Sequence, residues 1–124
     1  MHKVQYGTAR ALNHDNETKI DLEGMMPSVH IDNVGGMAIV ECAGRFVRND
    51  AALKLRDAVK SQANARVVVL DLTDMHAIGG GGLGTLLLLQ KWARDHDIRF
   101  KLFNPCARVL DKLKHVDFEI VRTA

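Results

Sequence analysis

The stretch Val67–Leu89, VVVLDLTDMHAIGGGGLGTLLLL, places four consecutive glycines between two apolar runs. The first run is nearly continuous and rich in valine, which predicts a strand over residues 66–72 that is buried on both faces in the middle of a sheet. The second run predicts a helix over about residues 82–97. A glycine cluster indicates a positive φ, a sharp turn or a close approach by another molecule. We therefore interpret the glycine loop as the feature that the rest of the chain presents.

Upstream of this stretch, apolar and polar residues alternate in two segments, 29–33 and 37–42. They are separated by Gly35-Gly36, a pair that tolerates positive φ and favours a tight turn, so the two segments predict a β-hairpin. Residues 44–47 are expected to form a connector. Residues 50–63 place their apolar side chains on one face at 100° per residue, which predicts an amphipathic helix.

The helix and strand boundaries follow from local signals. Asn49 or Asp50 is expected to cap the helix over residues 50–63, because both side chains accept hydrogen bonds from free backbone N–H groups. Residues 98–103 alternate in polarity and predict a strand. Asn104-Pro105 predicts the start of a short helix, and residues 118–121 predict a last strand. The element order is β-β-α-β-α-β-α-β, which indicates an α/β fold with helices packed on a mixed sheet.

Length and composition set the domain organisation and the compartment. The 124 residues predict one domain, over residues 28–124, preceded by a polar, aperiodic and flexible arm over residues 1–27 that can hold a short helix or an edge strand. The net charge of +2 is scattered along the chain, which argues against nucleic acid as a partner. No apolar run approaches the length of a membrane span, so membrane insertion is not expected. With two cysteines and no secretion signal, we expect a cytoplasmic protein.

The glycines do not predict a nucleotide site. Gly79, Gly81 and Gly84 match the G-x-G-x-x-G pattern, but residues 73–78 separate them from the preceding strand. The spacing from Gly79 to Gly84 also matches a phosphate-binding loop, yet Thr85 stands where that loop requires lysine. A weak anion site at the helix N-terminus stays open as an alternative.

Catalytic and metal chemistry are not expected either. The six histidines have no metal-binding spacing with Cys, Asp or Glu. Ser28 and Ser61 are the only serines, and neither is near the glycines in sequence, so no nucleophilic triad can be built. Cys42 is expected to be a buried strand residue, and Cys106 to be structural. We therefore predict neither an enzyme nor a cofactor.

The helix after the glycines suggests a contact surface. Leu86, Leu89, Trp92 and Ala93 share its predicted core face, whereas Leu83 and Leu87 fall on the opposite arc with polar residues. Exposed apolar residues beside a glycine loop favour a site for a protein partner, although another segment of the chain could cover them. The predicted partner-binding residues are Met75, His76, Gly79, Gly80, Gly81, Gly82, Leu83, Gly84 and Leu87.

The quoted stretch, together with Ile98–Pro105 and the segment around Val109-Leu110, resembles STAS domains, the anti-sigma-factor antagonists and their relatives. The resemblance covers about residues 28–121 and implies the same element order. It also implies a partner: in that family the antagonist captures an anti-sigma factor that is also a serine kinase. That kinase switches the antagonist off by phosphorylating a serine in an Asp-Ser-Ser-Gly-Leu-Gly segment at the helix start.

In this chain glycines replace the regulatory part of that segment. Gly82-Leu83-Gly84 match its end, whereas Gly79 stands for the aspartate, Gly80 for the phosphorylated serine and Gly81 for the second serine. Glycine has no hydroxyl group, so no phosphorylation is expected at position 80. Thr85 is the nearest hydroxyl, but it lies on the predicted core-facing arc.

Three functions stay open from the sequence. The chain is an anti-sigma-factor antagonist without the serine switch, a STAS subunit of a lipid-transport or sensory complex, or a sensor of a small ligand or nucleotide. The identity of the partner and the formation of a homodimer stay open as well.

Overall fold

The computed structural model describes residues 4–6 and 26–123, and for residues 4–6 it describes only the backbone. The predicted arm over residues 1–27 lies almost entirely outside this range, apart from a short edge strand that begins the sheet. The elements in chain order are β1 (Val4–Tyr6), β2 (Ser28–Val34), β3 (Met37–Phe46), α2 (Asn49–Lys60), β4 (Val67–Asp71), β5 (Met75–Ile78), α3 (Gly80–Asp95), β6 (Arg99–Phe103), α4 (Ala107–Leu113) and β7 (Glu119–Val121).

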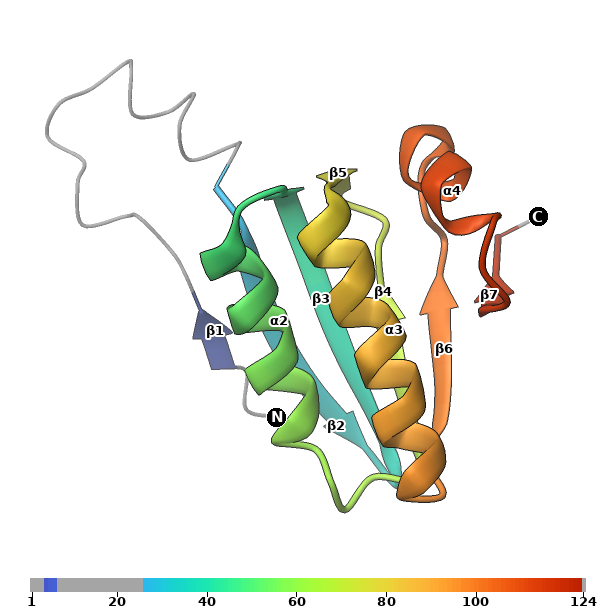
Figure 1. Cartoon of the computed structure of the whole chain (residues 1–124). Helices are drawn as coiled ribbons and strands as arrows, with labels where there is room; N and C mark the ends of the chain where they lie inside the picture. Colours follow the sequence, from blue (N-terminus) through green and yellow to red (C-terminus); the bar gives the residue numbers. More distant parts are fainter. Residues whose placement is uncertain (1–3, 7–25, 124) are drawn as a thin grey trace, which may run out of the picture.

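The strands form one mixed sheet in the order β1-β2-β3-β4-β6-β7 (Figure 1). β1, β2 and β3 pair antiparallel, whereas β3, β4, β6 and β7 pair parallel. β5 lies off this path and pairs only with the end of β3. The predicted mixed α/β fold is confirmed, with β1 and β5 as additions to the predicted order.

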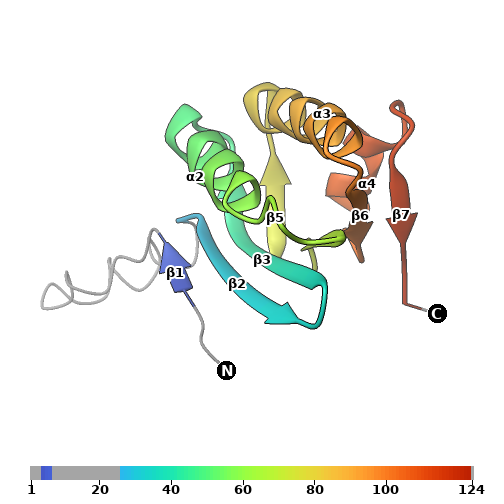
Figure 2. The same ribbon diagram turned by 90° about the horizontal axis from the view of Figure 1, so that it is seen from below.

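Helices α2 and α3 lie side by side on one face of the sheet (Figures 1 and 2). Alternate residues of β3 and β4 point into the core between sheet and helices, so Val40, Val68 and Leu70 are fully buried. Val67 and Val69 point to the other face and are only half-buried. The prediction that residues 66–72 are buried on both faces is therefore wrong. Valine in this strand reflects β-propensity as well as burial.

The hairpin between β2 and β3 turns at Gly35-Gly36, as predicted, and only Gly35 takes a positive φ, of 61°. The predicted connector at residues 44–47 is wrong, because residues 44–46 continue β3 past a bulge and pair with β5. Gly44 has a φ of 97°, and a Cβ there would overlap the backbone carbonyl of Met26. This glycine is therefore required inside a strand, where the sequence pattern places the end of one.

The sequence pattern misses β5 because its four residues, Met75–Ile78, carry no clear period. Only the first and last are buried, and this spacing of three residues is typical of a helical turn rather than of strand alternation. Such a short strand is recognisable only from its partner, the end of β3.

The helix caps also differ from the predictions. The cap of α2 is Arg48 rather than Asn49 or Asp50, and Asp50 lies in the first turn instead. The cap of α4 is Cys106, because Asn104 adopts the left-handed region with a φ of 56° and Pro105 precedes the helix. In both cases the predicted polar residue is within two positions of the observed boundary. Helix ends are the least certain part of an assignment by pattern.

Candidate functional site

Backbone hydrogen bonding joins the start of α3, which we call its entrance, to the end of β3. Gly79 caps the helix with extended backbone, and its N–H donates to the carbonyl of Phe46 at 2.9 Å. The N–H of Leu83 closes the first turn by donating to the carbonyl of Gly79 at 2.9 Å. No side chain caps the helix, and its first turn contains no acidic residue. Backbone groups rather than side chains therefore cap this entrance.

The glycines at this entrance have different surroundings. A Cβ on Gly82 would lie 2.8 Å from Cγ1 of Ile78 and 3.0 Å from the carbonyl oxygen of Phe46, so a side chain there has no room. A Cβ on Gly80 or Gly84 would meet nothing within 4 Å. On Gly81 it would contact only Oδ1 of Asn49, at 3.4 Å.

Positive φ does not explain this cluster. Within the described part of the chain, the glycines with positive φ are Gly35 and Gly44, and α3 begins at Gly80 rather than near residue 82. Most of the glycine loop is therefore the first turn of the helix. Close packing accounts for Gly82, whereas Gly80 and Gly84 leave the outer surface of the helix bare.

Two leucines follow this bare surface on α3. Leu88 is 63% exposed and Leu87 is 40% exposed, whereas Leu83 is half-buried and packs against the core. Leu87 is thus placed as predicted, Leu83 only in part, and Leu88 was missed. The helical wheel contains a signal for Leu88, because it follows Gly84 by four residues and lies on the same side of the helix.

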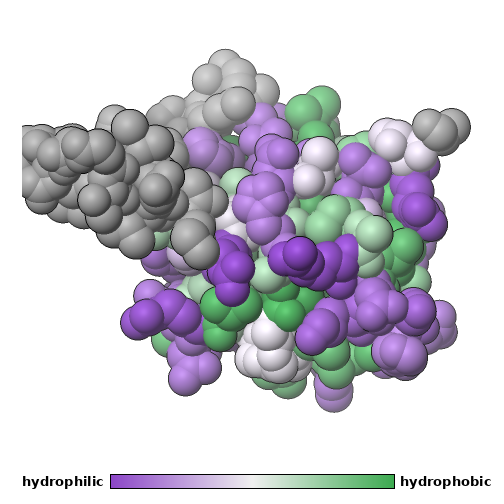
Figure 3. All heavy atoms as spheres, turned by 90° about the horizontal axis from the view of Figure 1, so that it is seen from above, coloured by the Kyte–Doolittle hydropathy of each residue, from purple (hydrophilic) through white to green (hydrophobic). Residues whose placement is uncertain are grey.

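Val47 extends this apolar surface across the helix entrance. It is exposed and lies against Gly79, where an added Cβ would come within 3.7 Å of Cβ of Val47. Seen from this end of the molecule, hydrophobic and near-neutral residues lie among hydrophilic ones (Figure 3). We call this surface the α3 entrance surface, and it consists of Val47, Gly80, Gly84, Leu87 and Leu88.

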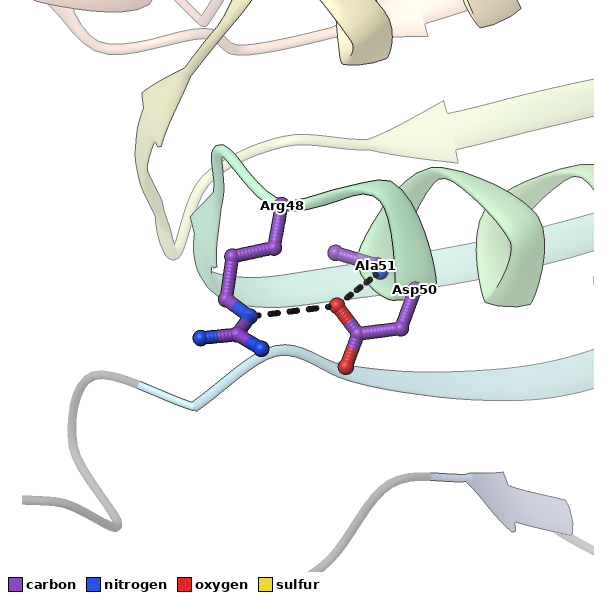
Figure 4. Close-up of polar contacts among 3 residues, drawn as sticks. All are labelled: Arg48, Asp50 and Ala51. Carbon is purple, nitrogen blue, oxygen red and sulfur yellow. Dashed lines mark hydrogen bonds and ion pairs between the residues drawn. The ribbon is translucent and has the colours of Figure 1, made fainter.

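A polar rim adjoins the entrance at the start of α2 (Figure 4). Asp50 accepts hydrogen bonds through Oδ1 from Nε of Arg48 at 3.4 Å and from the backbone N–H of Ala51 at 3.0 Å. Arg48 and Asp50 are both largely exposed, so their ion pair contributes little to stability. An apolar centre with a charged rim is the usual anatomy of a protein interface.

The two predicted residues before the glycines are placed differently. Met75 is fully buried in the core, which corrects its prediction as a contact residue. Its carbonyl accepts a hydrogen bond from Sγ of Cys106 at 3.5 Å. His76 is exposed. The alternation of β5 separates the two, because neighbouring strand residues point to opposite sides.

The chemistry available near the entrance is limited. Burial, together with the nearby carboxylates of Asp71 and Glu41, raises the pKa of the Cys42 thiol, which therefore stays protonated. The hydroxyl of Ser61 donates to the carbonyl of Ala58 at 2.6 Å, at the far end of α2. Among the residues that the structure describes, no three His, Cys, Asp or Glu side chains form a group that could hold a metal ion. The described helices also include none long and apolar enough to cross a membrane.

Comparison with known proteins gives one family and a set of similar folds. The family model described as STAS domain matches residues 26–123. Comparison with curated proteins gives no match. The structure is similar to the unphosphorylated anti-sigma factor antagonist SpoIIAA, with a TM-score of 0.64 and 13% identity, over 77% of this chain and 89% of that chain.

Two further solved structures have the same fold. SpoIIAA in its phosphorylated form, described as a Bacillus cell fate determinant, gives a TM-score of 0.66 at 12% identity, over 77% of this chain and 91% of that chain. An anti-sigma factor antagonist from Mycobacterium paratuberculosis gives a TM-score of 0.64 at 20% identity, over 77% and 85%. At these identities the similarity concerns the fold.

Proposed function

The chain belongs to the STAS domain family, and we propose that it is a non-catalytic protein-binding module of the anti-sigma-factor antagonist kind. Support comes from two structural neighbours that are named as anti-sigma factor antagonists, and from a third that is the phosphorylated form of one of them, SpoIIAA. The described part of the chain also offers apolar contact area rather than a cluster of reactive groups at the start of α3. The proposed partner is an anti-sigma factor, including one with serine-kinase activity.

The observation that carries the proposal is the exposure of two adjacent leucines beside a bare helix entrance. Leu87 and Leu88 present apolar area to solvent, and no side chain from Gly80 or Gly84 stands in front of them. Exposed apolar area rimmed by charge marks protein-interaction sites. The backbone of the first turn is therefore accessible to a partner that also covers the leucines.

We propose that this chain is not regulated by phosphorylation at the start of α3. Position 80 has space for a serine, because its Cβ would meet nothing within 4 Å, yet it holds glycine. A phosphate there would add close to two negative charges to the surface. Thr85 is half-buried and a poor substitute. We infer that partner binding by this chain is constitutive.

The experiment measures binding of the wild-type chain to each anti-sigma factor of its host by isothermal titration calorimetry. We expect Leu88→Asp to weaken binding by about tenfold or more, because it places a charge in the centre of an apolar contact. Leu53→Asp is the matched control, since Leu53 is 48% exposed on α2 and outside the α3 entrance surface. Both variants should unfold within a few degrees of the wild type.

A second variant tests the missing switch. Gly80→Ser should fold and bind as the wild type does, and a serine-kinase partner with ATP should then phosphorylate it and release it. If the wild type and Leu88→Asp bind equally well, the α3 entrance surface is not the contact site for the partner. A stable complex with a different protein would favour a STAS subunit of another assembly. Thermal stabilisation by a nucleotide without any protein complex would favour a ligand sensor.

A further inference from the structure

We draw no further inference here: the strongest candidate, the hollow of about 200 Å³ over the paired strand residues His30, Glu41 and Asp71, is a cluster of acidic residues for which nothing in the structure shows a ligand.

Discussion

Glycine serves different purposes at the end of β3 and at the start of α3. At the end of β3, Gly44 takes a positive φ and lies against the backbone of Met26, so the fold itself requires it. At the start of α3, the described glycines adopt no positive φ. Gly82 lacks space for a side chain, and a Cβ on Gly79 would lie 3.3 Å from Cα of Val47, whereas Gly80 and Gly84 have open space around them. The fold thus depends more strongly on Gly44 in β3 than on most of the four consecutive glycines at residues 79–82.

Gly80 and Gly84 are not required by the backbone of α3. The backbone of α3 would accept other residues at positions 80 and 84, and other residues favour a helix by up to about 1 kcal/mol over glycine. Helix stability therefore does not explain Gly80 or Gly84. Their effect is to keep the outer side of the entrance free of side chains, which agrees with the proposed contact surface.

The strongest test of the comparison is Gly44→Ala. The change forces a positive φ on alanine and pushes its Cβ into the carbonyl of Met26, so we expect a loss of about 3 kcal/mol or more in the free energy of unfolding. Urea denaturation measures the effect. A loss below about 1 kcal/mol would mean that the bulge relaxes easily and that Gly44 is replaceable.

A smaller loss is expected for Gly82→Ala. The new Cβ would approach Ile78 to 2.8 Å and the carbonyl oxygen of Phe46 to 3.0 Å, so the helix must move away from β3. Part of this cost is offset by the higher helix propensity of alanine, which leaves a net loss of about 1–2 kcal/mol. Thermal unfolding should show a lower Tm. An unchanged Tm would show that the helix entrance is loosely packed.

The smallest effect, and the opposite sign, is expected for Gly84→Ala. The Cβ meets nothing within 4 Å, so the gain in helix propensity is unopposed and should amount to about 0.5–1 kcal/mol. The same denaturation experiment should show a higher midpoint. Loss of stability here would contradict the distinction between Gly82 and Gly84, which lie two residues apart on one helix.

Most of the fold was predictable because its hydrophobic periods are clear. The hairpin, the two long helices and the parallel strands each follow a pattern of period 2 or 3.6, and the structure contains all of them. The resemblance to STAS domains is confirmed by the family match over residues 26–123. The errors are at positions where tertiary contacts decide, namely the continuation of β3 through Gly44, the short β5 and the caps Arg48 and Cys106.

The candidate site was predictable in location but not in composition. The sequence places it at the start of α3, and Leu87 is exposed there as predicted. Met75 is next to the loop in sequence, which suggests a contact role, but strand alternation buries it. Leu88 was missed among four leucines because burial differs between neighbours on a helix. The helical wheel nevertheless places Leu88 on the side away from the buried Leu86, Leu89 and Ala93, so its exposure could have been predicted.

The division of β3 at its bulge has a consequence for the order of folding. Met37–Ala43 pair with β2 across a two-residue turn, a local contact that forms within about 1–10 μs in isolated hairpins. Gly44–Phe46 find their strand partner in β5, some thirty residues later in the chain. Closing so long a segment is slow compared with closing a turn. Met37–Glu41 also pair with β4 over a similar separation. Both parts of β3 therefore need a distant strand to complete their pairing, and Gly44–Phe46 need the residues that lead into α3.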